Sequence, residues 1–139
     1  MKALTLELPV PPSPNTVNTR SHMARHRSKR KYQKAAWIAA IKQSEPFTDP
    51  PTHVVMHAHF RLHNLRDDDN LQASLKWLVD ALRQAQTGKD WRAGVYSRRG
   101  YFVDDNPAHM TLGTVTQEIQ RKNKGVTVTI EYADEMEAA

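Results

Sequence analysis

The chain has 139 residues, of which 39% are hydrophobic and 25% are charged. This length supports one hydrophobic core and leaves no room for a second domain of ordinary size. The absence of cysteine excludes disulfides, thiolate metal sites and cysteine nucleophiles. No apolar run approaches the ~20 residues of a membrane span, and residues 1–10 lack the pattern of a secretion signal. We therefore expect a soluble cytoplasmic protein.

Positive charge is concentrated near the start of the chain. The 20 Lys and Arg residues outnumber the 15 Asp and Glu residues, and no acid lies between Glu7 and Glu45. The basic residues of this interval are Arg20, Arg25, Arg27, Lys29, Arg30, Lys31, Lys34 and Lys42. A field of one sign attracts polyanions, so this segment predicts contact with nucleic acid. The alternative is a solvated helix face or a basic arm with no partner.

The first half of the chain reads as a strand, a helix and a second strand. Residues 3–8 alternate between leucine and other side chains, and the prolines that follow end the strand. A loop over residues 13–20 leads to a helix expected over residues 27–44. Residues 53–62 form the next strand, with His57 and His59 on the face opposite its apolar side chains. These histidines suit an ordinary surface better than a transition-metal site.

A leucine stripe predicts a second helix, the clearest element in the sequence. Its members step by four and three residues: Leu71, Leu75, Leu78, Leu82 and Ala85. Asp69 is expected to be the N-cap of this helix, and Gln72 to complete a capping box.

The remaining chain reads as a long polar loop followed by two strands. The loop covers residues 86–100, and the strands are expected over residues 110–119 and 126–132. Because residues 121–125 supply a turn, we expect these strands to form a hairpin. The prediction is a small single α/β domain over residues 1–133, in the order β-α-β-α-β-β, with a flexible acidic tail over residues 134–139.

Five carboxylates fall in two short clusters of this basic chain, Asp67 to Asp69 and Asp104 to Asp105. Acids packed closely raise each other's pKa unless a cation lies among them. Mg²⁺ takes oxygen ligands and is commonly held by one or two carboxylates together with substrate phosphate. Together with the basic segment, the clusters favour a magnesium site that activates water against a phosphodiester. The alternative is that Asp69 caps a helix and residues 104–107 form a turn.

Lys76 is placed by helix geometry on the side of the helix that carries Asp69. Seven residues at 100° each bring the two side chains within about 20° of each other, at ~10 Å of axial rise. A lysine side chain leans toward the N-terminus of its helix, so its ammonium could reach a phosphate held by the acids. An exposed lysine without a role is the alternative.

Four sequence blocks together resemble the RusA-type Holliday junction resolvases. They are Leu8-Pro9-Val10-Pro11-Pro12-Ser13 with Asn15, Arg66-Asp67-Asp68-Asp69-Asn70-Leu71, Asp80-Ala81-Leu82 and Val103-Asp104-Asp105. The blocks occur in the order of the family and span nearly the whole chain. The combination of Asp-x-Asp-Asn-Leu, Asp-Ala-Leu and a later Asp-Asp is fairly specific.

This resemblance implies a mixed four-stranded sheet and a homodimer, encoded by a bacterium or a phage. It also implies a magnesium-dependent endonuclease, with Mn²⁺ as a substitute, that nicks four-way DNA junctions symmetrically in recombination and repair. The metal ligands would be Asp67, Asp69 and Asp105, and the lysine at the scissile phosphate would be Lys76. Asp68, Asp104 and Arg66 would lie around this site. No membrane or organic cofactor is implied.

The chain departs from the family pattern in two places. In the short form of the motif the lysine comes four residues after the second aspartate, where this chain has Ala73. Lys76 lies three residues further along, and it matches the family only in its four-residue spacing to Asp80. The link over residues 83–103 is also longer than expected, and it carries aromatic residues together with Arg98 and Arg99. Such a mixture suits contact with DNA, or cover for a sheet edge or dimer surface.

Two other functions remain open from the sequence. The first is a basic nucleic-acid-binding module without catalysis, whose acids only cap and turn the chain. The second is a metal-dependent nuclease that acts on flaps or RNA.

Overall fold

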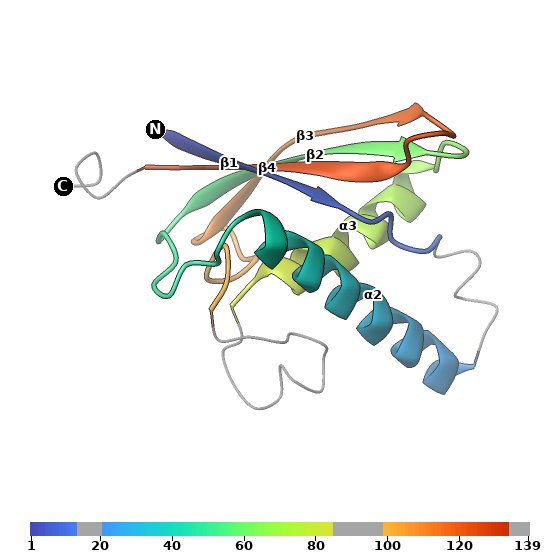
Figure 1. The fold of residues 1–139 in the computed structure, drawn as a ribbon, viewed down its shortest axis with the longest axis horizontal. Helices are drawn as coiled ribbons and strands as arrows, with labels where there is room; N and C mark the ends of the chain where they lie inside the picture. Colours follow the sequence, from blue (N-terminus) through green and yellow to red (C-terminus); the bar gives the residue numbers. More distant parts are fainter. Residues whose placement is uncertain (14–20, 85–98, 134–139) are drawn as a thin grey trace.

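Two helices cover one face of a four-stranded mixed sheet in the computed structural model, which describes residues 1–13, 21–84 and 99–133 (Figure 1). The elements are β1 (Lys2–Leu8), α2 (His22–Gln43), β2 (Val54–Leu62), α3 (Asp68–Leu82), β3 (Met110–Ile119) and β4 (Gly125–Tyr132). The predicted order β-α-β-α-β-β is confirmed. The expected acidic tail lies outside the described residues. Within them, no helix is long and apolar enough to cross a membrane.

The strand order β1-β4-β2-β3 shows that the predicted hairpin is wrong. β4 pairs antiparallel with β1 and with β2, whereas β3 runs parallel to β2. The link from β3 to β4 therefore passes the end of β2. The Gln120 amide donates to the Leu62 carbonyl at 2.8 Å, and Arg121 Nε donates to the His63 carbonyl at 3.3 Å. A short link thus joins two strands that lie on either side of a third.

The core lies between the helices and the apolar face of the sheet. In β2 the buried residues alternate with half-buried ones, and the same holds for most of β4. All four leucines of the predicted α3 stripe are buried. Each such side chain contributes about 1.5–3 kcal/mol on burial. The central residues are Leu6, Met56, Phe60, Leu78, Val128 and Ile130.

Both helices begin earlier than their sequence patterns suggest. α2 begins at His22, because the Ser21 side chain accepts a hydrogen bond from the Ala24 amide at 3.2 Å. The N-cap of α3 is Asp67 and not Asp69, since Asp67 Oδ1 accepts from the Asn70 amide at 2.9 Å. Acids in the first turn of a helix are favoured by its dipole, so Asp68 and Asp69 stabilise this earlier start.

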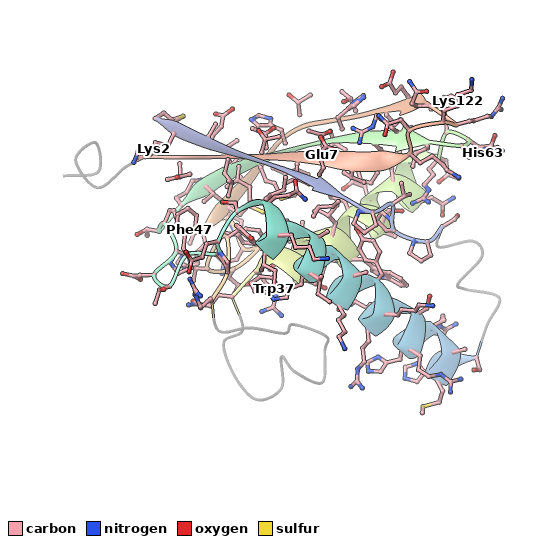
Figure 2. All side chains as sticks on the ribbon, viewed as in Figure 1. Lys2, Glu7, Trp37, Phe47, His63 and Lys122 are labelled. Atoms are coloured by element: carbon pink, nitrogen blue, oxygen red, sulfur yellow. The ribbon has the colours of Figure 1, made fainter. Side chains whose placement is uncertain are left out.

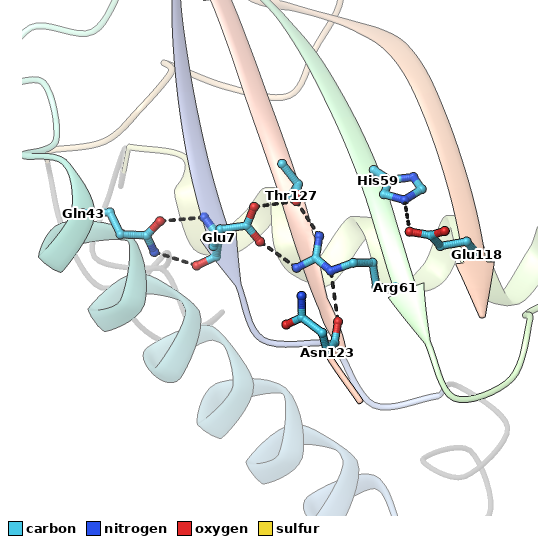
Figure 3. Close-up of polar contacts among 7 residues, drawn as sticks. All are labelled: Glu7, Gln43, His59, Arg61, Glu118, Asn123 and Thr127. Atoms are coloured by element: carbon cyan, nitrogen blue, oxygen red, sulfur yellow. Dashed lines mark hydrogen bonds and ion pairs between the residues drawn. The ribbon is translucent and has the colours of Figure 1, made fainter. Parts of the chain in front are cut away.

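The uncovered face of the sheet carries a polar network around Glu7 (Figure 3). Thr127 and Arg61 donate to the two Glu7 carboxylate oxygens at 2.6 and 2.7 Å. The Gln43 amide, at the end of α2, pairs with the backbone N–H and C=O of Glu7 at 2.7 and 2.6 Å. Gln43 therefore provides hydrogen-bond partners for two backbone groups of the edge strand β1, and it joins α2 to the sheet.

We expect Glu7→Gln to destabilise the protein at neutral pH and to have less effect in acid. Partial burial raises the pKa of Glu7, but the hydrogen bonds from Thr127 and Arg61 outweigh it and place the pKa below 4.5. Because the folded state then binds fewer protons than the unfolded state, the contribution of Glu7 is present above pH 4.5 and is lost as the pH falls through the folded pKa. Urea unfolding at pH 7 and pH 3 measures the free energy of unfolding of the wild type and the variant. If the difference between the two proteins is the same at both pH values, the proposed titration of Glu7 is wrong.

A bulge between β2 and β3 accommodates the ring of His57. The register shifts between Met56 and Ala58, and a Cβ at Gly113 would lie 2.3 Å from His57 Cε1. The Thr114 amide donates to His57 Nδ1 at 2.9 Å. Nδ1 is therefore the acceptor, and Nε2 carries the proton toward Glu131 at 2.9 Å.

Gly113→Ala should accordingly destabilise the protein by about 1–3 kcal/mol, the usual cost of overpacking. The new methyl group displaces the His57 ring, which then loses its bonds to Thr114 and Glu131. Thermal unfolding measures the loss. The double variant His57→Ala with Gly113→Ala should recover part of the stability, because the ring is no longer displaced. If Gly113→Ala lowers the stability equally in the wild type and in His57→Ala, displacement of the His57 ring is not the cause.

Candidate active site and nucleic-acid interface

The three acids at the start of α3 are exposed at one end of the helix layer. Asp67 uses one carboxylate oxygen to cap the helix. Asp68 and Asp69 occupy the first turn. Carboxylate oxygens in this position are accessible to a cation or to a donor from a bound molecule.

The second acidic cluster is positioned by a buried anchor just before it. Tyr101 and Phe102 are both fully buried. The Tyr101 amide donates to the Leu82 carbonyl at 2.9 Å, and the Gln84 amide donates to the Phe102 carbonyl at 3.0 Å. The Tyr101 hydroxyl donates to the Ser44 carbonyl at 2.6 Å. These bonds hold residues 100–103 along the end of α3.

Asp105 forms an ion pair with Lys76 of α3. The hydrogen bond from Lys76 lowers the pKa of Asp105, against the opposing effect of burial. Burial lowers the pKa of Lys76, but Asp105 and the charge of Asp80 outweigh this effect and raise it. At neutral pH the pair is a carboxylate and an ammonium, and it joins the segment after Phe102 to the middle of α3.

Asp105 therefore meets α3 at Lys76, and the seven-residue spacing places Lys76 and Asp69 on the same side of the helix. Ala73 lies between Asp69 and Lys76 on that side, since residues three or four apart are neighbours on a helix. Within residues 1–13, 21–84 and 99–133, no group of three or more His, Asp or Glu side chains is arranged to hold a metal ion. The donors are nevertheless of the right kind for Mg²⁺, because all are carboxylate oxygens.

Asp104 turns the chain at this point. Its Oδ1 accepts from the Asp105 amide at 2.8 Å, and its Oδ2 accepts from Asn106 Nδ2 at 3.3 Å. Asn106 in turn accepts from the Ala108 amide at 3.0 Å. Asp104 therefore orients the backbone that carries Asp105, as side chains of this type do in turns.

Arg66 connects three segments next to the acids. Its guanidinium donates to Ser74 Oγ and to the Pro11 carbonyl, both at 2.7 Å. Its backbone pairs with the Gln117 side chain at 2.9 and 2.8 Å. Burial lowers the pKa of Arg66, although the group remains charged at neutral pH. Arg66 thus fixes the proline-rich segment against α3.

The basic residues predicted to bind DNA lie mainly on α2, whose first half points away from the sheet (Figures 1 and 2). α2 contains no acidic residue. Its basic residues from the predicted set are Arg25, Arg27, Lys29, Arg30, Lys31 and Lys34. Arg20 and Arg98 lie outside the described residues. Arg99 donates to Glu45 and to the Pro46 carbonyl, both at 2.9 Å.

Sequence reasoning missed a role for Asp80, which is buried near Lys76. Asp80 lies within 4 Å of the cationic groups of Lys29, Lys76 and Arg83. The available signal was an acid between Val79 and Ala81 within an apolar stretch of a helix, where burial requires partners. The partner on α2 is too far along the chain for spacing to reveal it.

Comparisons with known proteins give no family for this chain: no protein-family model matches it, and no curated protein matches it.

Proposed function

We propose that this protein is a metal-dependent endonuclease of the RusA type that acts on branched DNA. The observation that supports this best is the ion pair between Lys76 and Asp105, on the side of α3 that carries Asp69. It joins a lysine of α3 to an acid from a segment 29 residues further along the chain. The basic helix α2 packs against α3 and would supply the DNA contacts.

The residues proposed to hold Mg²⁺ are Asp67, Asp69 and Asp105. When bound, the ion would stabilise charge on the attacked phosphate and activate a water molecule. Lys76 would place a positive charge at the scissile phosphate, and Asp104 and Arg66 would orient the chain on either side. Asp68 would lie at the edge of the site.

A junction with two-fold symmetry is nicked on two strands, so a homodimer with two matched sites suits the proposed substrate. The proposed setting is the cytoplasm of a bacterium or of a phage-infected cell.

A nicking assay on defined substrates tests the proposal. Labelled four-way junction, duplex, flap and RNA are each incubated with the protein, with Mg²⁺, with Mn²⁺ and without metal. The expected result is paired symmetric nicks in the junction that depend on the metal. If the protein nicks flaps or RNA in preference to junctions, it is a nuclease but its substrate is not the four-way junction.

The second candidate is a nucleic-acid-binding module without catalysis. It is favoured by the fact that Asp67 caps α3 and Asp105 pairs with Lys76, so both acids have partners within the chain. This function predicts a gel shift that weakens with salt and needs no Mg²⁺. Binding without nicking in any metal would select it.

A further inference from the structure

Asp80 lies in an unfavourable position unless it is paired. Asp80 is 7% exposed, and among the residues that the structure describes it is the only acidic residue that is buried. It lies in the last turn of α3, where the helix dipole disfavours negative charge. A buried carboxylate is costly unless cations and donors surround it. The structure therefore has to supply compensating contacts at this position.

Three cations supply them, from two helices. Asp80 Oδ1 lies 3.4 Å from Lys76 Nζ and 3.7 Å from Arg83 Nε. Asp80 Oδ2 lies 3.3 Å from Lys29 Nζ of α2. The two oxygens thus face different partners, one set on α3 and one on α2.

The pair of Lys76 with Asp80 is not explained by local helix stability. An acid four residues before a lysine is the favourable order on an isolated helix, and here the lysine comes first. Lys76 instead has an acid on both sides, Asp105 from the following segment and Asp80 from its own helix. A lysine ammonium on a flexible stem takes its position from such partners.

We propose that Asp80 is a positioning residue, which holds Lys76 beside Asp105 and, through Lys29, fixes the basic helix α2 relative to the site. The charges alternate along the series Asp105, Lys76, Asp80 and Lys29. Lys29, whose side chain is 29% exposed, then joins the two helices and is not a principal DNA contact. This inference rests on the proposed nuclease function for the role of Lys76.

A double-mutant cycle tests whether Asp80 acts through Lys76. The variants are Asp80→Asn, Lys76→Ala and their combination, compared by single-turnover nicking of a saturating junction. We expect Asp80→Asn to lower the rate at saturating junction roughly ten- to a hundredfold. In the Lys76→Ala background the fold-loss should be much smaller, since only the contact of Asp80 with Lys29 remains to be lost. An equal fold-loss in both backgrounds would overturn the proposal. Asp80→Glu should restore part of the rate.

A second measurement does not depend on nuclease activity. Limited reductive methylation followed by mass spectrometry reports the reactivity of each lysine. In Asp80→Asn, Lys29 and Lys76 should both react faster relative to Lys2, and unchanged reactivity would overturn the proposal. If the wild type nicks no DNA, the proposed function fails while this measurement still decides the role of Asp80.

Variants on α2 provide the matched control and keep the test usable if Asp80→Asn does not fold. Lys29→Gln removes a cation that shares the Asp80 carboxylate with Lys76, so Lys76 should react more slowly than in the wild type, and DNA affinity should fall less than in Lys34→Gln. Lys34→Gln, at an exposed position of the same helix, should weaken DNA binding and leave Lys76 unchanged. Identical effects of the two variants would refute a distinct role for Lys29.

Discussion

Replacement of Asp69 by asparagine should abolish metal-dependent nicking of a four-way junction while leaving junction binding intact. Asparagine keeps the size of the side chain but loses the charge that a divalent cation requires. We expect the rate to fall below about 1% of wild type, because changes to the outer partners of metal ligands already cost up to about a hundredfold. Single-turnover nicking and a gel shift on the same junction, in Mg²⁺ and in Ca²⁺ respectively, measure the two properties.

Two neighbouring variants control for indirect effects on α3. Asp68→Asn changes an adjacent exposed acid of the first turn and should retain most activity. Asp67→Asn should lose activity without losing helix stability, because asparagine caps helices as well as aspartate does. Wild-type nicking by Asp69→Asn would show that the proposed roles of the acids are wrong.

Local patterns predicted the elements because each depends on neighbours in sequence. The leucine stripe of α3 and the alternation in β2 and β4 reflect which side of each element is buried. Strand pairing depends on contacts that the patterns do not contain. The clean apolar alternation of β4 suits a central strand, whereas the polar, largely exposed β3 suits an edge. That contrast, weighed against the short link between them, would have argued against a hairpin.

The site was predictable only where its residues share one helix. Asp69 and Lys76 could be placed on one side of α3 from their spacing. The pairing of Lys76 with Asp105, and of Lys29 with Asp80, joins segments that only the folded chain brings together. The N-cap was misplaced because three consecutive aspartates are all suitable caps, and the choice among them follows from where the helix packs.

Phe102→Ala should destabilise the fold and impair the site together. Phe102 is 0% exposed, and its carbonyl accepts the Gln84 amide at the end of α3. Loss of a buried phenylalanine side chain costs about 3–5 kcal/mol. Because Asp104 and Asp105 follow within three residues, the segment that carries them loses its anchor. Urea unfolding should show the loss of stability.

The decisive comparison is nicking at a temperature where the variant remains folded. If residues 100–103 position Asp105, Phe102→Ala should nick the junction more slowly even when fully folded. Leu6→Ala removes a buried side chain from β1, a strand that carries none of the proposed site residues, and it should lose stability but keep its rate when folded. Equal rates in the two folded variants would mean that Asp105 is held independently of its buried neighbour, by the ion pair with Lys76 alone.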